Sequence, residues 1–166
     1  MQLESYLIMK PYTATFRKNS NVLFTCEHAS GRIPRSHKKL GLRTDELLQA
    51  EGDWYDLGAH ELTQELASHF GASTLEANFS RLFIDYNRRP DADLKVKNSF
   101  HSCALKEHLL IYDGKEEKKI VIPGNLFSNR GEEERRRWEE YVRPYQKKGS
   151  NLQKRLKRNT PMSLSF

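Results

Sequence analysis

Cysteine is nearly absent from this sequence, which contains only Cys26 and Cys103 among its 166 residues. Disulfide-rich secreted domains need several paired cysteines, and paired CxxC ligands are typical of structural zinc sites. Neither pattern occurs here. The first residues, MQLESYLIMK, carry an acidic side chain before a very short apolar run and have no small-residue cleavage site, which is atypical of a secretory signal. We therefore expect a cytoplasmic protein.

Long apolar runs are also missing. No stretch approaches the roughly 20 apolar residues that cross a bilayer, so we expect no membrane partner. The sequence has no Gly-rich phosphate loop and no nucleophile elbow, which argues against P-loop nucleotide enzymes and α/β serine hydrolases. A chain of 166 residues fits one domain of ordinary size, and we expect a single domain over residues 1–166. Nothing in the sequence indicates an oligomeric state.

Positive charge is in excess, with 28 Lys and Arg against 22 Asp and Glu, a formal net charge of +6. Such a field attracts anionic partners. The segment Lys147–Arg158, KKGSNLQKRLKR, is the most basic stretch. It contains no aromatic side chains for base stacking, and most charge runs are solvated helix faces, which disfavours nucleic acid as a partner. A non-catalytic module that binds an anionic ligand or nucleic acid through this segment remains the alternative to an enzyme.

The stretch VLFTCEHASGRIP, residues 22–34, changes abruptly from apolar to polar after Cys26. This pattern predicts a buried strand over residues 22–26 that ends in a polar loop. In α/β sheets, ligands bind beyond the carboxyl ends of strands, where Glu27 and His28 would lie. The imidazole could bind a metal or transfer a proton, and the carboxylate could be a ligand, an orienting group or a general base. The alternative is a hydrogen-bonded loop end without chemistry.

Two further carboxylates, Asp53 and Asp56, flank Trp54-Tyr55 near the start of a helix predicted over residues 54–70. Positions three apart on a helix share a face, so both could point toward one site. Acidic residues at helix N-termini also cap free backbone amides, and that interpretation stays open.

A second polar cluster surrounds the apolar trio Leu82-Phe83-Ile84, for which we predict a strand over residues 81–85. Arg81 precedes the trio, and Asn87 and Arg88 follow it. Guanidinium groups suit carboxylate recognition, so this cluster is a candidate anion-binding corner. An ion pair between Asp85 and an arginine is the alternative.

The remaining pattern predicts an α/β fold. The other elements that we expect are a short helix at residues 44–49, strands at 13–16, 73–77, 109–112, 120–122 and 161–166, and a helical region over 132–158 that Pro144 and Gly149 divide.

Five segments, in this order, resemble the N-formylglutamate amidohydrolase family: VLFTCEHASGRIP, DWYDLGA, SRLFIDYNR, IPGN and YVRPY. The similarity extends from residue 21 to residue 166. It implies a three-layer α/β/α fold with a mixed, mainly parallel central sheet, related to the zinc carboxypeptidases. It also implies metal-dependent hydrolysis of the amide bond in N-acyl amino acids such as N-formylglutamate.

The resemblance assigns roles to particular residues. His28 and Asp56 match the family's metal ligands, with Asp53 as a substitute for Asp56, and zinc is the expected metal. Glu27 becomes the candidate proton shuttle. The residues expected to hold the small anionic acyl-amino-acid substrate are Ser30, Arg32, Arg81, Asn87 and Arg88.

Two departures from the family pattern accompany these assignments. Gly52 stands where many members have a histidine, and the chain ends at Phe166, where members continue into a histidine-containing motif. Because a hydrolytic zinc usually takes three protein ligands and one open position, we expect the third ligand to lie outside this chain. A truncated member, a fragment and a short form that binds without catalysing all fit this expectation.

Overall fold

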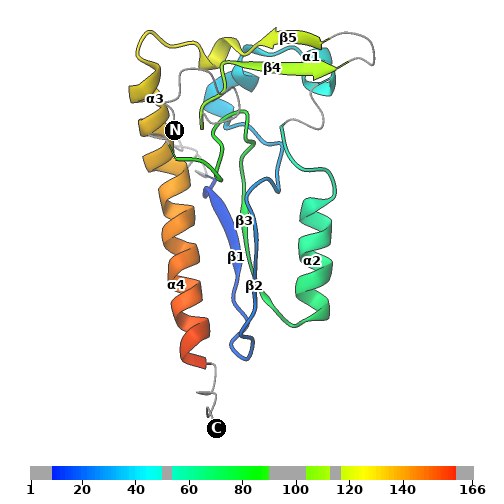
Figure 1. Cartoon of the computed structure of the whole chain (residues 1–166), viewed down its shortest axis with the longest axis vertical. Helices are drawn as coiled ribbons and strands as arrows, with labels where there is room; N and C mark the ends of the chain where they lie inside the picture. Colours follow the sequence, from blue (N-terminus) through cyan, green and yellow to red (C-terminus); the bar gives the residue numbers. More distant parts are fainter. Residues whose placement is uncertain (1–8, 50–53, 90–103, 113–116, 160–166) are drawn as a thin grey trace, which may run out of the picture.

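The computed structural model describes residues 9–49, 54–89, 104–112 and 117–159 (Figure 1). Two strands, a 3-10 segment and two helices come first: β1 (Tyr12–Thr15), β2 (Leu23–Cys26), η1 (Arg35–Gly41), α1 (Thr44–Gln49) and α2 (Ala59–His69). The later elements are β3 (Ser73–Ala77), β4 (His108–Tyr112), β5 (Glu117–Val121), the 3-10 turn η2 (Pro123–Asn125), α3 (Arg130–Arg137), the π turn Trp138–Val142 and α4 (Arg143–Asn159).

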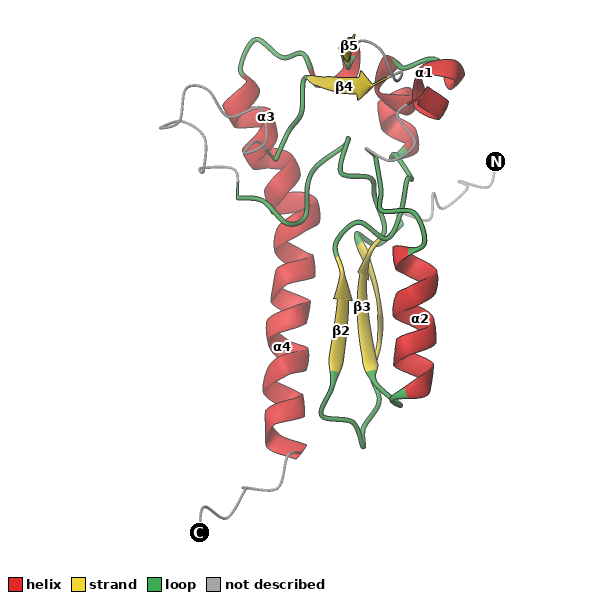
Figure 2. Ribbon diagram, turned by 45° about the vertical axis from the view of Figure 1, so that its right-hand side comes forward, coloured by secondary structure: helices red, strands yellow, loops and turns green. Residues whose placement is uncertain are grey.

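A three-stranded mixed sheet in the order β1-β3-β2 lies at the centre of the fold. β1 runs antiparallel to β3, and β2 runs parallel to it, with Phe24 opposite Thr74. Every residue of β3 is buried. Helices α2 and α4 contact β2 and β3 from opposite sides (Figure 2). The α/β class predicted from the sequence is confirmed, while the wider, mainly parallel, carboxypeptidase-like sheet stays a prediction.

The strands predicted at residues 109–112 and 120–122 are present as a separate antiparallel pair, β4-β5, in which Leu109 lies opposite Ile120, and β5 begins three residues earlier than predicted and ends one residue earlier. The predictions of α1 and β3 are confirmed at both ends, β1 lies one residue earlier than predicted, and β2 begins one residue later and ends as predicted. The strand predicted at residues 161–166 lies outside the described residues, as does Cys103. Within the described part of the chain, no helix combines the length and the apolar character needed to cross a membrane.

Helix α2 begins later than predicted, at Ala59 rather than at Trp54. The backbone before it is hydrogen-bonded to the turn after β3 instead. The Trp54 carbonyl accepts from Ser80 Oγ at 2.7 Å and from Arg81 N at 3.2 Å. Gly58, at φ +77°, then turns the chain into the helix. Residues 54–58 therefore form a loop against the rest of the polar cluster.

The strand predicted over residues 81–85 is wrong, because this segment is a buried turn. Ser80 organises it: its carbonyl accepts from Phe83 N at 3.0 Å and Ile84 N at 3.2 Å, and its hydroxyl accepts from Leu82 N at 3.1 Å. The apolar trio is fully buried. A run of three buried apolar residues does not distinguish a strand from a buried turn, which explains the error.

The division of the C-terminal helical region at Gly149 is wrong, since α4 runs through it, whereas Pro144 is the second residue of α4, directly after the preceding element. Pro144 follows the π turn Trp138–Val142, in which Arg143 N bonds to the Trp138 carbonyl, so the hydrogen-bond pattern is already shifted where proline lacks its N–H. Gly149 faces the sheet: a Cβ added there would lie 3.1 Å from Leu75 Cδ2. Glycine thus lets α4 pack closely on β3.

Candidate functional site

Backbone hydrogen bonds join the three polar loops that the sequence singled out. Asp56 N donates to the His28 carbonyl at 3.0 Å, and Ser80 N donates to the Arg32 carbonyl at 2.7 Å. Together with the bond from Arg81 N to the Trp54 carbonyl, at 3.2 Å, these contacts hold the loop after β2, the loop before α2 and the turn after β3 in one place.

His28 lies between two carboxylates. Its Nδ1 is 3.3 Å from Asp56 Oδ2, and its Nε2 is 3.0 Å from Asp85 Oδ1. The imidazole is 13% exposed, so most of the ring is covered and a small part reaches solvent. A histidine in this position can bind a cation or exchange a proton at the exposed side of the ring.

Asp56 uses its two oxygens differently. Oδ2 faces His28, and Oδ1 forms an ion pair with Arg81 Nη2. The carboxylate is 52% exposed and does not cap α2, where Gly58 occupies the N-cap position. The capping interpretation of Asp56 is therefore wrong. Asp53, its proposed substitute, lies outside the described residues.

Asp85 is the buried partner of His28, with only 2% of its side chain exposed. Its Oδ1 also accepts from Asn87 N at 2.9 Å, and its Oδ2 accepts from Arg88 Nε at 3.0 Å. Burial by itself raises the pKa of Asp85, but the hydrogen bonds from His28 and Asn87 N, with the charges of His28 and Arg88, outweigh it and lower the pKa below its ordinary value. The ion pair considered from the sequence exists, but the contact with His28 was not foreseen.

Glu27, the residue before His28, is bonded to helix α4. Its Oε1 accepts a hydrogen bond of 3.0 Å from the hydroxyl of Tyr145, which is buried on α4. Burial, with the nearby charge of Glu27, raises the pKa of Tyr145, so the phenol stays protonated and donates. The proton-shuttle role of Glu27 remains a prediction.

One protein-family model covers the segments that carry all of these residues. The model of the N-formylglutamate amidohydrolase family matches residues 20–165, which include every polar loop described above. The chain belongs to the N-formylglutamate amidohydrolase family. None of the curated proteins matches it.

A solved structure is also similar to this N-formylglutamate amidohydrolase family member. The gene product Atu2144 from Agrobacterium tumefaciens is 26% identical, with a TM-score of 0.65. The alignment covers 86% of this chain and 49% of that one, so the chain spans about half the length of the solved protein.

His28 Nδ1 and Asp56 Oδ2 are placed as two of the ligands of a zinc ion would be. With bonds of 2.0–2.1 Å, adjacent ligands of tetrahedral zinc are about 3.3 Å apart. His28 Nδ1 and Asp56 Oδ2 have this separation, 3.3 Å, and the other ring nitrogen faces a carboxylate, as in most histidine ligands. Within residues 9–49, 54–89, 104–112 and 117–159, no group of three His, Cys, Asp or Glu is arranged to hold a metal ion. The described residues thus fit part of a zinc site.

The other predicted substrate residues lie around this pair with different exposure. Arg88 is partly exposed, and the Asn87 side chain is exposed while its backbone N–H serves Asp85. Ser30 Oγ accepts from Arg32 N at 3.2 Å, which fixes the loop. Arg81 and Arg88 are each one carboxylate away from His28, Arg81 through Asp56 and Arg88 through Asp85.

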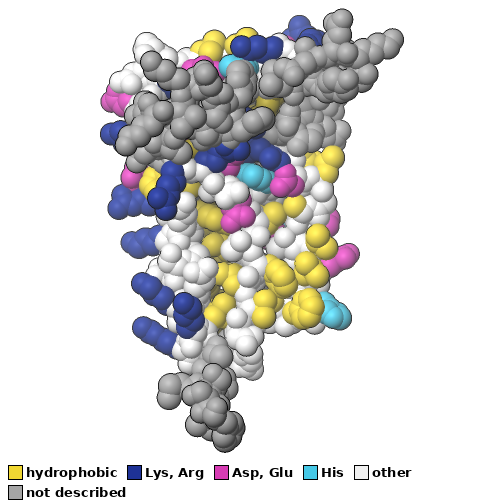
Figure 3. All heavy atoms as spheres, viewed as in Figure 1, with side chains coloured by type: hydrophobic (Ala, Val, Ile, Leu, Met, Phe, Trp, Pro, Cys, Tyr) yellow, Lys and Arg dark blue, Asp and Glu magenta, His cyan; other side chains and the backbone are white. Residues whose placement is uncertain are grey.

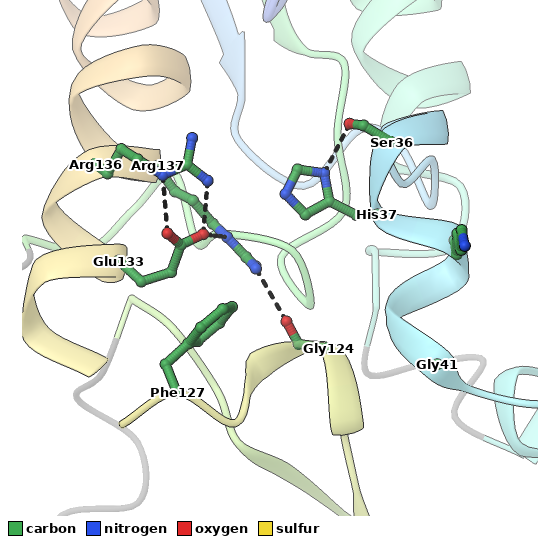
Figure 4. A pocket seen from close by; sticks show the side chains of 9 residues that line it. Ser36, His37, Gly41, Gly124, Phe127, Glu133, Arg136 and Arg137 are labelled. Atoms are coloured by element: carbon green, nitrogen blue, oxygen red, sulfur yellow. Dashed lines mark hydrogen bonds and ion pairs between the residues drawn. The ribbon is translucent and has the colours of Figure 1, made fainter. Parts of the chain in front are cut away.

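The fourth family segment, IPGN, supports the buried turn. Asn125 Nδ2 donates to the Leu82 carbonyl at 2.7 Å, and Asn125 Oδ1 accepts from Arg137 Nη1 at 2.7 Å. Arg137 is fully buried and also donates to the Phe83 carbonyl at 3.0 Å. Figure 4 shows this guanidinium at the wall of a hollow of about 470 Å³ between η1 and α3. These residues hold the Phe83 segment in place, a role that sequence reasoning missed because it depends on contacts distant in the chain.

Proposed function

We propose that this chain carries the metal-binding and substrate-binding part of a zinc-dependent amidohydrolase that cleaves the amide bond of N-acyl amino acids such as N-formylglutamate. The observation that carries the proposal is the 3.3 Å separation of His28 Nδ1 and Asp56 Oδ2 within a chain of this family. His28 has two carboxylates beside it, those of Asp56 and Asp85, and each pairs with a guanidinium group, that of Arg81 or Arg88. The carboxylates suit the charge of a metal ion, and the guanidinium groups suit that of an acidic substrate.

In this proposal His28 and Asp56 hold the zinc ion. When bound, zinc would supply Lewis-acid polarisation of the amide carbonyl and a more acidic water. Asp85 keeps the His28 ring in place through its hydrogen bond to Nε2. Arg81 and Arg88 attract the substrate carboxylates, and Asn87, Ser30 and Arg32 complete the proposed substrate-binding set.

Glu27 moves the protons of the reaction. Its Oε2 would accept a proton from the attacking water and return it to the leaving amine nitrogen. The hydrogen bond from Tyr145 to Oε1 limits the orientations of the carboxylate. Glu27 and His28 are adjacent in sequence at the carboxyl end of β2, which brings a proton carrier and a metal ligand to the same end of the sheet.

We also propose a three-layer, carboxypeptidase-like fold and a cytoplasmic location for this protein. Helices on both sides of the sheet support the three-layer, carboxypeptidase-like arrangement. Sparse cysteine supports a cytoplasmic enzyme.

Zinc binding and hydrolysis by purified variants test this function. The wild-type protein should bind zinc, measured by competition with a chromophoric chelator, and release glutamate from N-formylglutamate. Replacing either ligand, in His28→Ala or Asp56→Ala, should weaken zinc binding at least tenfold. The matched controls are His69→Ala and Asp45→Ala, which replace exposed residues of the same types on α2 and α1. Zinc binding that is absent from the wild type, or equal in all four variants, would refute the metal assignment.

One observation favours a second candidate function. Seven of the 28 basic residues and none of the 22 acidic ones lie on α4, which leaves 21 basic against 22 acidic residues in the rest of the chain. The net positive charge of the protein thus comes from one helix. Figure 3 shows these basic side chains along the edge of the molecule that α4 forms. Both buried leucines of this helix, Leu152 and Leu156, face the interior, so its outer face is polar.

A polar basic rod suits the phosphate backbone of a nucleic acid, bound without regard to sequence. Reversing the charge of Lys147, Lys154 and Arg158, all exposed on α4, should then weaken binding of a short DNA duplex in fluorescence anisotropy by at least tenfold. Reversing the exposed Lys10, Lys118 and Arg135 is the control. Affinity that does not fall with salt, or that falls equally in both triple variants, would count against this function.

A further inference from the structure

Asp85 accepts hydrogen bonds at both carboxylate oxygens. The Asn87 backbone N–H and the Arg88 Nε–H can only donate, and they lie 2.9 Å and 3.0 Å from Oδ1 and Oδ2 respectively. The side chain is 2% exposed, so water does not compete for these positions. Asp85 is therefore a buried carboxylate without a proton.

The proton on His28 follows from this. Nε2 lies 3.0 Å from Asp85 Oδ1, which is the closer and the buried acceptor, whereas Nδ1 faces the half-exposed Asp56, so the hydrogen of a neutral ring is favoured on Nε2. A neutral imidazole carries one hydrogen, which leaves a lone pair on Nδ1. That lone pair faces a second acceptor, Asp56 Oδ2, at 3.3 Å. Two acceptors that face each other repel unless a cation or a proton lies between them.

We propose that Asp85 is a positioning residue that holds His28 in the tautomer protonated on Nε2, so that the Nδ1 lone pair and Asp56 Oδ2 together present a cation site. The tautomer is a property of the metal-free chain. Only the identity of the cation rests on the proposed function.

The exposure of the two aspartates decides which side of the ring receives the cation. Asp56 is 52% exposed, so its side chain is open to solvent. Asp85 is buried, with both oxygens already bonded to donors that would have to leave. Carboxylates that accept from the far nitrogen of a metal-binding histidine fix its tautomer and orientation in this way.

The tautomer can be measured directly in metal-free protein. Long-range ¹H–¹⁵N correlation spectra of ¹⁵N-histidine-labelled protein at pH 9, where an ordinary imidazole is neutral, report which ring nitrogen carries the hydrogen. The His28 signal is assigned by its absence in His28→Gln. We expect a hydrogen on Nε2 and none on Nδ1. A wild-type ring protonated on Nδ1, alone or together with Nε2, would overturn the proposal, and this result needs no folded variant.

Asp85→Asn tests the causal role of the carboxylate. The amide can donate to Nε2 from its nitrogen, so the Nδ1-protonated tautomer should become populated. A change that only loosened the fold would not move the proton between ring nitrogens, and the other histidine signals report whether the fold is kept. Asp45→Asn, at an exposed position, is the control and should leave the His28 tautomer unchanged. An unchanged tautomer in Asp85→Asn would overturn the proposal.

Zinc affinity separates this proposal from the proposed function. Loss of such an orienting carboxylate typically costs 10–100-fold in metal affinity, so Asp85→Asn should bind zinc about 10–100-fold more weakly than the wild type and Asp45→Asn equally well. A wild type that shows the expected tautomer without binding zinc would refute the metal-dependent function and keep the role of Asp85. Equal zinc affinity in Asp85→Asn and the wild type would refute the role of Asp85 in presenting the cation site and leave the function standing.

Discussion

Tyr145 and Glu27 are 118 residues apart in the chain, and the tyrosine hydroxyl donates a hydrogen bond of 3.0 Å to the glutamate. This contact joins α4 to the end of β2, next to His28. The Tyr145 ring also packs edge-on against Tyr86, with ring centres 5.3 Å apart. Helix α4 therefore takes part in ordering the candidate site although it contributes none of the proposed ligands.

Tyr145→Phe removes the hydroxyl and keeps the ring. Hydrogen bonds to charged groups contribute about 1.5–3 kcal/mol, so we expect the free energy of unfolding in urea to fall by about 1–2 kcal/mol. Tyr12→Phe, at a half-buried position on β1, is the control and should change it by less than about 0.5 kcal/mol. Equal stability of the two variants would show that Tyr145 contributes through its ring alone.

Arg137 should be far more important for stability than its neighbour Arg136. Arg137 is fully buried and donates to Glu133, Asn125 and two backbone carbonyls, whereas Arg136 is half exposed. Removing one partner of a buried ion pair costs about 3–5 kcal/mol. Arg137→Met should therefore lower the free energy of unfolding by about that amount, and Arg136→Met by about 1 kcal/mol or less. Similar losses in the two variants would contradict the buried network.

Glu133 should make the stability depend on pH in the acid range. Hydrogen bonds from Arg136, opposed by burial and reinforced by the bond from Arg137, lower the pKa of Glu133 from 4.5 to about 2. The unfolded state then binds more protons than the folded state between these values. The stabilisation is complete above about pH 4.5 and is lost as the pH falls toward 2.

Urea unfolding of the wild type and Glu133→Gln at pH 7 and pH 3 measures this contribution. We expect the wild type to exceed the variant by about 1–2 kcal/mol more at pH 7 than at pH 3, after allowance for solvent screening. Parallel changes of the two proteins with pH would show that Glu133 does not supply the acid sensitivity.

The parts of the site that sequence reasoning located share a simple signal. Glu27 and His28 follow an apolar run directly, and β2 does end where that run ends. The contact between His28 and Asp85 spans 57 residues, and no local pattern encodes it. The turn that carries Asp85 was predicted as a strand because burial of Leu82, Phe83 and Ile84 gives the same apolar run in either structure.

Gly149 shows why local propensity was misleading for α4. Glycine disfavours helix, yet here it lies inside one because the sheet leaves no room for a side chain. The same reasoning separates it from Gly131 in α3, around which an added Cβ would meet nothing within 4 Å. The two glycines make a matched pair, both helical and different in their surroundings.

Replacing each glycine by alanine should therefore have opposite effects. Gly131→Ala gains helix propensity without a clash and should raise the free energy of unfolding by about 0.5 kcal/mol. Gly149→Ala places a methyl group 3.1 Å from Leu75 Cδ2, and Leu75 is fully buried with little room to move. Because overpacking costs about 1–3 kcal/mol, more than the gain in propensity, we expect Gly149→Ala to be destabilised by about 1 kcal/mol in urea unfolding. A stabilised Gly149→Ala would mean that α4 shifts away from β3 easily, and the hydrogen bond between Tyr145 and Glu27 would then be expected to weaken as well.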